Sequence, residues 1–305
     1  MRLLIIGAGG FLGSHVRRQA GAAGLTITSA SRSALPGSPS HQRLDLSADG
    51  PETIAAVIGS AAPDAVINCA GATTGAPEVL AAANITGTHA LATAMLRANA
   101  PARLVHLGSA AEYGPSEPGA PVTESAPARP AGAYGLTKLA GTLLVETART
   151  AGLDAVALRV FNPVGRGAPE NGLPGSLAAQ LRRAQADGTE VRLGPLDAVR
   201  DFVDARDVAD AALAAAMAPA LPHGVLNVGS GRGVPARTLV KELLAISACD
   251  TGMHEDGAGS PRSEGRSWQQ ADISRTCRDL GWRPCRDLTA SLSDLWEAGD
   301  GRGTG

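Results

Sequence analysis

One stretch decides the fold of this 305-residue chain: Gly7-Ala8-Gly9-Gly10-Phe11-Leu12-Gly13, which follows a short apolar run at residues 3–6. The same stretch opens a helical pattern at residues 11–22, so it predicts a strand, a tight turn and a helix in succession. The early glycines permit the turn and let backbone amides approach an anion, while Gly13 lets the helix pack closely on the strand. The amides at the helix N-terminus would then bind a phosphate.

The first 160 residues repeat this alternation of short apolar runs and longer helical patterns. The expected strands and helices occupy, in turn, residues 25–30, 52–61, 65–69, 79–98, 104–107, 133–150 and 155–159. Strands that alternate with helices predict an α/β fold, a doubly wound parallel Rossmann sheet. Its ligand is expected where the loops after the strands converge.

A second lobe is expected after residue 165, where the chain becomes irregular and rich in Gly and Pro. We predict a dinucleotide-binding Rossmann domain over residues 1–165, a smaller C-terminal α/β substrate lobe over 166–298, and a disordered tail over 299–305. Segments near 200–230, including a helix at 207–217 and a strand at 225–228, are expected to return to the main sheet. The last 50 residues would help to complete the smaller lobe.

Charge and cysteine content argue against several classes of function. Lys and Arg total 27 against 29 Asp and Glu, so no overall basic field would attract nucleic acid or a membrane. The four cysteines form no CxxC pair, which argues against a metal site or a disulfide framework. No signal-peptide pattern and no apolar run of membrane-spanning length is evident, and we expect a cytoplasmic protein.

The end of the second expected strand indicates the cofactor. In NAD-binding Rossmann proteins an acidic residue there binds the ribose hydroxyls. This chain has Ser31-Arg32-Ser33, where no carboxylate would repel a 2′-phosphate and a guanidinium with two hydroxyls could bind it. NADP(H) is therefore favoured, and NAD(H) stays possible if Arg32 only caps the strand in solvent. Asp45 is placed to contact the adenine amino group.

A tyrosine and a lysine supply the expected chemistry. Tyr134 and Lys138 lie four residues apart, on one face of the expected helix. A cation so close favours the phenolate form of a tyrosine, which can then exchange a proton with a substrate oxygen. Ser109 follows a strand, and its hydroxyl would point into the same crevice. Serine is also a common turn former, so its role depends on the nearby Tyr/Lys pair.

These motifs together resemble the extended short-chain dehydrogenase/reductase family of nucleotide-sugar epimerases, dehydratases and 4-ketoreductases. The resemblance covers nearly the whole chain and rests on residues 7–13, 68–71, 84–88, 109–114, 134–138, 159–163, 200–203, 227–231 and 280–284. It implies a catalytic set of Ser109, Tyr134 and Lys138.

The resemblance also implies the binding residues. Cofactor contacts would come from the loops after the strands and from two helices: Gly7, Gly10, Phe11, Leu12, Gly13, Ser31, Arg32, Ser33, Asp45, Leu46, Cys69, Ala70, Gly71, Asn84, Leu107, Tyr134, Lys138, Phe161 and Val164. Substrate contacts would come from Thr73, Ser109, Ala110, Asn162, Arg200 and Arg262. The two arginines would grip a nucleotide diphosphate, unless they form ordinary salt bridges. Relatives often pair through the helices at 79–98 and 133–150, so we expect a homodimer with a four-helix interface.

The run that starts at Ser109 discriminates among the family's reactions. Dehydratases that resemble this chain have Thr-Asp-Glu there, whereas this chain has Ser109-Ala110-Ala111 and lacks the acid and base for elimination. Residues 109–114, 161–165 and 193–203 also resemble GDP-4-keto-6-deoxymannose reductases. The resemblance therefore implies NADPH-dependent reduction of a 4-keto-6-deoxy nucleotide sugar, with hydride delivered to C4 and the proton supplied by Tyr134.

Three other functions stay open at this point. A nucleotide-sugar 4-epimerase with retained NAD needs the same hydride step, but such enzymes generally have an acidic residue where this chain has Arg32. A non-catalytic dinucleotide-binding sensor would typically lose Tyr134 or Lys138, and both are retained here. A reductase of small aldehydes or ketones would show only weak binding of nucleoside diphosphates.

Overall fold

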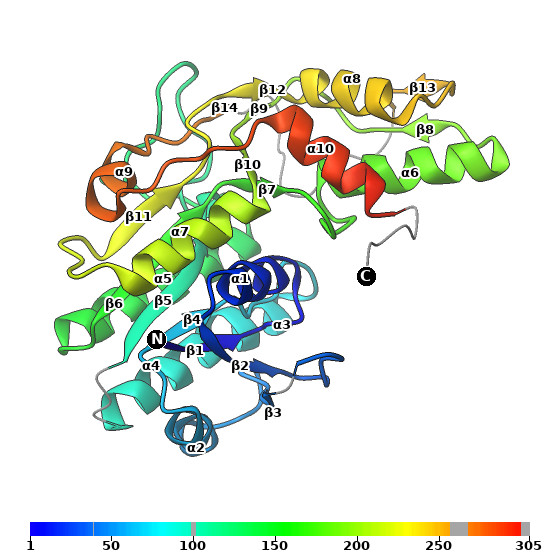
Figure 1. The fold of residues 1–305 in the computed structure, drawn as a ribbon. Helices are drawn as coiled ribbons and strands as arrows, with labels where there is room; N and C mark the ends of the chain where they lie inside the picture. Colours follow the sequence, from blue (N-terminus) through cyan, green and yellow to red (C-terminus); the bar gives the residue numbers. More distant parts are fainter. Residues whose placement is uncertain (39, 99–101, 257–267, 300–305) are drawn as a thin grey trace.

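A seven-stranded parallel sheet forms the centre of the protein (Figure 1), in a computed structural model that describes residues 1–38, 40–98, 102–256 and 268–299. The strand order is β11-β6-β5-β4-β1-β2-β3. The strands are β1 (Arg2–Ile6), β2 (Thr26–Ser31), β3 (His41–Arg43), β4 (Ala65–Asn68), β5 (Arg103–Ser109), β6 (Ala155–Val160) and β11 (Val225–Val228). The order reverses between β1 and β4, which makes this a doubly wound Rossmann sheet, as predicted.

Helices cover both faces of this sheet because alternate residues of each strand feed two different cores. Leu3 and Ile5 of β1 pack on the side of α1 (Phe11–Ala22) and α7 (Ala205–Met217). Leu4 and Ile6 pack on the other side, where the covering helices are α2 (Pro51–Ala61), α4 (Gly87–Ala98) and α5 (Ala133–Thr150). A parallel strand buried on both faces needs this continuous apolar run rather than an alternating one.

The helix expected at residues 79–98 is interrupted. It consists of α3 (Pro77–Ala81), a π-helical turn η1 (Ala82–Thr86) and α4. The start of α4 lies against the backbone of Leu46, where a Cβ on Gly87 would come within 2.7 Å of the Leu46 carbonyl oxygen. The segment Pro77–Ala98 is long and apolar enough to cross a membrane by length and composition, but half of its most apolar window is buried inside the protein.

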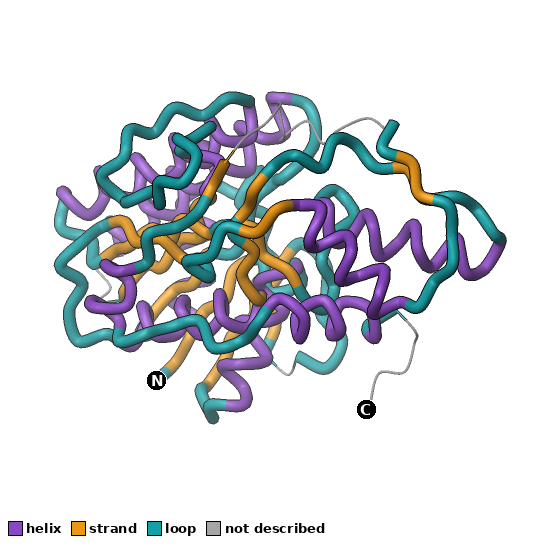
Figure 2. The backbone as a smooth tube through the Cα atoms, turned by 90° about the horizontal axis from the view of Figure 1, so that it is seen from above, coloured by secondary structure: helices purple, strands orange, loops and turns teal. Residues whose placement is uncertain are grey.

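A smaller second lobe lies beyond the carboxyl ends of the sheet strands (Figures 1 and 2). Its helices α6 (Leu173–Asp187), α8 (Ala236–Ser247) and α10 (Leu288–Glu297) share a leucine-rich core, with pairs such as Leu177 and Leu181 spaced four residues apart on the apolar face of each helix. Its short strands are β7 (Asn162–Val164), β8 (Val191–Arg192), β9 (Val199–Arg200), β10 (Phe202–Asp204), β12 (Val234–Pro235), β13 (Met253–His254) and β14 (Trp268–Gln269).

The C-terminal segment departs from the prediction. Helix α9 (Ser274–Leu280) packs on β11 and α7, and Trp282 is buried in the core beneath α1 and α7. The indole of Trp282 donates to the carbonyl of Asp207. The expectation that the last 50 residues complete the smaller lobe is therefore wrong for this stretch, which returns to the Rossmann part before α10. Most of the predicted tail, residues 300–305, lies outside the described residues.

Asp201 joins the two parts of the fold. It lies between β9 and β10, and its side chain is fully buried. Its Oδ1 accepts hydrogen bonds from the amide and hydroxyl of Ser230, and its Oδ2 accepts from the amides of Gly231 and Ala271. Its backbone carbonyl accepts from the amide and side chain of Asn162. One residue thus fixes three segments around the end of β6.

Replacing Asp201 by asparagine is expected to lower the free energy of unfolding by about 3 kcal/mol, because an amide nitrogen would face donors and leave buried N–H groups unsatisfied. Urea denaturation of Asp201→Asn and of the exposed control Asp250→Asn measures the difference. Equal unfolding midpoints for the two variants would contradict the structural role of Asp201.

Candidate functional site

The glycine-rich turn brings α1 close to β1. Gly7 adopts a φ of +76°, and a Cβ on Gly13 would lie only 2.1 Å from the Gly7 carbonyl oxygen, so both positions require glycine. The N-cap of α1 is Gly10, which brings no side chain to the end of the helix. No side chain caps the first turn, so its amides can bind a phosphate group.

The ends of β2 and β3 form the next part of the crevice. The hydroxyl of Ser31 donates to the carbonyl of Ser33 and lies 3.0 Å from the His41 ring, whose Nε2 must therefore be the donor. The Arg32 side chain is exposed. The carboxylate of Asp45 accepts from the hydroxyl and amide of Ser47, and these bonds, with a smaller contribution from Arg32, lower its pKa. A cation and a fixed anion thus lie beside each other at this end.

The predicted lysine is buried at the end of β5. Lys138 donates from Nζ to the carbonyl oxygen of Leu107 at 2.6 Å. Burial lowers its pKa, while Glu112 and Cys69 act in the opposite direction. Tyr134 lies one turn earlier on α5 and is half-buried, so its phenol can face a ligand. Both residues lie on α5, four positions apart, and their catalytic role stays a prediction.

Ser109 is the last residue of β5 and the N-cap of a short 3-10 turn, η2 (Ala110–Glu112). Its hydroxyl accepts from the amide of Ala111 at 3.2 Å, and its own hydrogen can donate to a substrate oxygen. The amide of Ser109 donates to Oε1 of Glu112 at 2.7 Å. These two bonds fix both the backbone and the side chain of the serine.

Asn84 supports the site rather than lining it. From η1, its amide group accepts from the nitrogen of Ala72 and donates to the oxygen of Ala72 and to the hydroxyl of Thr137. This holds the loop after β4 onto α5, where a Cβ on Gly71 would lie 2.8 Å from Asn84 Oδ1 and 3.8 Å from Lys138 Nζ. The polar atoms of the Asn84 side chain bond to the protein, and its contact with the cofactor stays a prediction.

Three other predicted cofactor residues offer only backbone atoms. The side chains of Leu46, Phe161 and Val164 are buried in the protein core. Their contacts with the cofactor stay a prediction. Cys69 also lies in the crevice wall, where burial raises the pKa of its thiol to about 12, so it is uncharged at neutral pH.

The predicted substrate residues lie on the side of the second lobe. Asn162 is half-buried and donates to the carbonyl of Asp201. The hydroxyl of Thr73 accepts from Asn171, which links the loop after β4 to the second lobe. Arg200, on β9, donates to the carbonyl of Val199, and burial lowers its pKa. Arg262 lies outside the described residues.

Sequence reasoning missed a buried polar network beneath Ser109. The Nε of Arg159 donates to Glu112 at 2.7 Å, and its guanidinium lies 4.5 Å above the ring of Tyr113. The phenol of Tyr113 donates to Asn227 at 2.6 Å, and burial raises its pKa to about 12. The sequence signal for this network was Arg159, which lies within the apolar run of β6, because a buried charge needs a partner.

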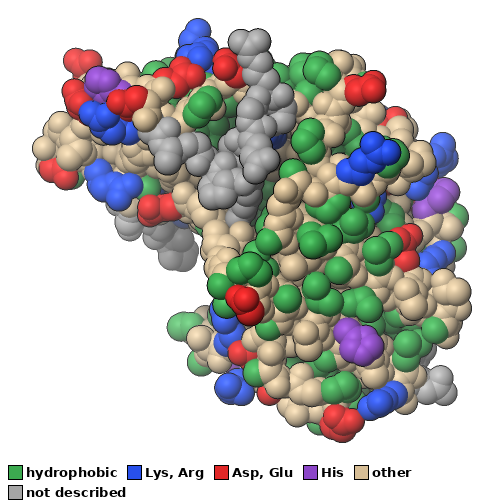
Figure 3. All heavy atoms as spheres, turned by 180° about the vertical axis from the view of Figure 1, so that it is seen from behind, with side chains coloured by type: hydrophobic (Ala, Val, Ile, Leu, Met, Phe, Trp, Pro, Cys, Tyr) green, Lys and Arg blue, Asp and Glu red, His purple; other side chains and the backbone are tan. Residues whose placement is uncertain are grey.

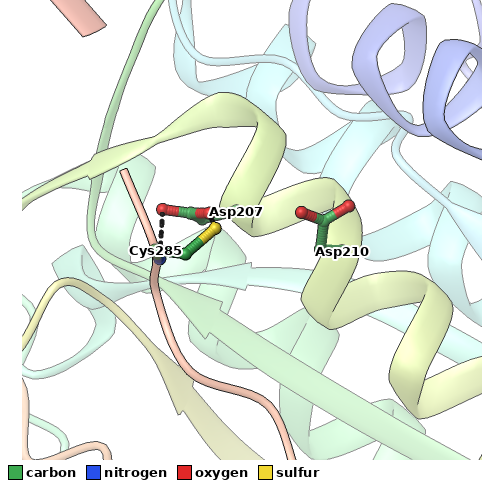
Figure 4. A group of neighbouring side chains, drawn as sticks. All are labelled: Asp207, Asp210 and Cys285. Atoms are coloured by element: carbon green, nitrogen blue, oxygen red, sulfur yellow. Dashed lines mark hydrogen bonds between the residues drawn. The ribbon is translucent and has the colours of Figure 1, made fainter. Parts of the chain in front are cut away.

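Asp207 and Asp210 of α7, with Cys285, have the atoms to ligate a metal, but these groups already bond to neighbouring protein groups. Asp207, Asp210 and Cys285 bring ligand atoms within 4.8 Å of one another (Figure 4). The guanidinium of Arg286 donates to both carboxylates, and the amides of Cys285 and Arg286 donate to Asp207. These bonds tie the C-terminal segment to α7, which gives the cluster a structural role.

Comparison with known proteins agrees with the fold. The chain belongs to the NAD dependent epimerase/dehydratase family, whose model matches residues 3–229. It is an NAD(P)-dependent enzyme of the extended short-chain dehydrogenase type.

Several relatives match nearly the whole chain. The chain is 39% identical to a dTDP-6-deoxy-L-talose 4-dehydrogenase (NAD(P)(+)) of Kitasatospora kifunensis, over 97% of this chain and 95% of the relative. It is 29% identical to a GDP-6-deoxy-D-mannose reductase of Pseudomonas aeruginosa, over 97% of each. A UDP-glucose 4-epimerase of Streptomyces lividans is 34% identical over 70% of this chain and 67% of its own length.

Solved structures show the same architecture. RMD from Pseudomonas aeruginosa, complexed with NADPH, superposes with a TM-score of 0.84 over 99% of this chain and 100% of its own, at 24% identity. MoeE5 in complex with UDP-glucose and NAD has a TM-score of 0.83 over 98% of each chain, at 25% identity.

Gly13→Ala is expected to weaken NAD(P)H binding at least about tenfold, because the added methyl group would push α1 away from β1 and from the phosphate position. Gly59→Ala is the matched control, since a Cβ on Gly59 of α2 meets nothing within 4 Å. Cofactor fluorescence titration compares the two variants. Wild-type affinity in Gly13→Ala would show that this close approach does not position the anion site.

Proposed function

We propose that the protein reduces a 4-keto-6-deoxy nucleotide sugar with NADPH. The observation that carries this proposal is the geometry around Lys138, which is buried, bonded to the end of β5 next to Ser109, and one turn from Tyr134. Two relatives that match nearly the whole chain are named as enzymes of 6-deoxy sugars linked to dTDP and GDP. Since the dTDP-linked relative is the more similar, dTDP-linked keto sugars are the first substrates to test.

The residues of the crevice divide the chemistry among them. Bound NADPH would supply the hydride that reduces the C4 carbonyl. Tyr134 donates its proton to the carbonyl oxygen, and Ser109 donates a hydrogen bond to the same oxygen and orients it. Lys138 stabilises the phenolate that forms on Tyr134. Arg200 and the second lobe would hold the diphosphate, while the amides at the start of α1 hold the cofactor pyrophosphate.

The preference for NADPH rests on the end of β2. Arg32 is exposed there, between two serines and beside no carboxylate of its own strand. A guanidinium in this place suits a 2′-phosphate. The leading alternative is a 4-epimerase with retained NAD, which the similarity to the Streptomyces lividans epimerase supports.

We also propose that two copies pair through α4 and α5. Three large apolar side chains of this region are more than half exposed: Val79 of α3 and Leu136 and Leu143 of α5, at 53%, 59% and 51%. Seen from behind, hydrophobic side chains gather over the face that these helices cover (Figure 3). A second copy on this face would complete a four-helix interface.

Tyr134→Phe is expected to lower turnover by about 10²-fold or more, because no other group replaces its proton, while NADPH affinity stays within about twofold. The assay follows NADPH oxidation with dTDP-, GDP-, UDP- and CDP-linked 4-keto-6-deoxy sugars. A wild-type protein that reduces none of them, yet interconverts a nucleotide sugar and its C4 epimer, would replace this function by the epimerase.

Arg32→Ala is expected to weaken NADPH binding about tenfold, or about 1.4 kcal/mol, and to leave NADH binding unchanged. The control is Arg192→Ala, an exposed ion-paired arginine of the second lobe. Both are measured by fluorescence titration. If NADH binds the wild-type protein more tightly than NADPH, the proposed role of Arg32 is wrong.

A further inference from the structure

Glu112 is buried directly beneath the candidate catalytic residues. Its side chain has no exposed surface. Oε1 accepts from the amide of Ser109 at 2.7 Å and from the hydroxyl of Thr142 on α5 at 3.0 Å, and Oε2 accepts from Arg159 on β6 at 2.7 Å. The carboxylate therefore connects the end of β5 with the helix that carries Tyr134 and Lys138.

Stability alone is a weak reason for such an ion pair. Removing two charges from water is costly, and a well-packed apolar pair of similar volume often stabilises a fold as well or better. The strand also makes room for the pair, because a Cβ on Gly108 would lie 2.6 Å from Oε1 of Glu112. The ion pair lies against Ser109 and α5, and a role in the site would explain this position.

We propose that Glu112 is the positioning residue of this site: it fixes the backbone of Ser109 and, bonded to Thr142 one turn after Lys138 on α5, brings a negative charge to that buried lysine. The inference rests on the proposed function to the extent that Ser109 and Lys138 serve the reaction. It assigns a role in the site to the Glu112–Arg159 ion pair.

The charges around Lys138 support this role. Cys69, on the loop after β4, is an uncharged thiol at neutral pH because burial raises its pKa to about 12. Burial and Lys138 itself hold the pKa of His106, on β5, well below its usual range, so the imidazole is neutral. Among the described groups that raise the pKa of Lys138, this leaves Glu112 as the negative charge. Arg159 pairs with Oε2 of Glu112, and its guanidinium lies over the ring of Tyr113. Glu124 acts to raise the pKa of Tyr113.

The lysine content of the chain permits a test without substrate. The sequence contains two lysines, buried Lys138 and exposed Lys241. In protein labelled with [¹³C]lysine, the Cε signals report the titration of each side chain, and Lys241→Arg assigns them. Glu112→Gln keeps an oxygen for the Ser109 amide but removes the charge, so the midpoint of Lys138 is expected to fall by about one pH unit or more, with Lys241 unchanged.

Two further variants separate charge from position. Glu112→Asp keeps the charge but is one methylene too short to hold Ser109, so the Lys138 midpoint should stay near that of the wild type while kcat falls at least about tenfold and KM changes little. Thr142→Val removes one of the two donors to Oε1 of Glu112 without changing the charge, so the Lys138 midpoint should stay close to wild type.

One control tests whether a variant folds, and another separates this proposal from the proposed function. If Glu112→Gln does not fold because Arg159 is left unpaired, Glu112→Gln/Arg159→Met removes both charges and should lower the Lys138 midpoint by a smaller amount. An unchanged midpoint in a folded, cofactor-binding variant would overturn the proposal, as would wild-type kcat in Glu112→Asp. Because the NMR titration needs no substrate, a shifted midpoint in a protein that reduces no keto sugar would refute the proposed function and leave the link between Glu112 and Lys138 standing.

Discussion

The close approach of α1 to β1 is the contact on which the rest of the structure depends. Gly13 allows it, since any side chain there would overlap the Gly7 carbonyl. The approach aims the first amides of α1 across the carboxyl ends of the sheet strands. Because α7 packs along α1, and the C-terminal segment is tied to α7 through Asp207, the second lobe is attached to the same frame. A shift of α1 would therefore displace residues of both the Rossmann part and the second lobe.

Buried polar side chains then give the crevice its shape. Loops that must approach a ligand cannot be fixed by apolar packing alone, because their amides and carbonyls need partners. Asn84 accepts a hydrogen bond from a backbone amide of the loop after β4. Glu112 accepts from the amide at the end of β5, and Asp201 accepts from an amide of the loop after β11. Each of these side chains bonds to backbone groups of a different loop. Each loop at this edge of the sheet thus has one buried polar side chain that bonds to its backbone.

The sequence predicted most of the fold because its main signal is local. The alternation of apolar runs and helical patterns indicated the strands of the sheet, and the rarity of tyrosine and lysine made Tyr134 and Lys138 stand out. The failures all involve distant partners. Gly87, after the π-helical turn, lies against Leu46, and Arg159 pairs with a carboxylate 47 residues away. No periodicity within one segment contains these contacts. The burial of the Phe161 side chain likewise depends on tertiary packing.

The same catalytic residues suit a reductase and an epimerase, so the difference between the two reactions must lie in how the cofactor is held. An epimerase returns its hydride to the sugar and needs no cofactor exchange, whereas a reductase must release the oxidised cofactor after each turnover. In this chain β3, at the edge of the sheet, has only three residues, and Arg32 is exposed. Electrostatic attraction at an exposed site is weakened by solvent and salt, so under the proposed preference for NADPH Arg32 would bind a 2′-phosphate without burying it. An adenosine end of this kind allows exchange, and this supports the reductase over the epimerase.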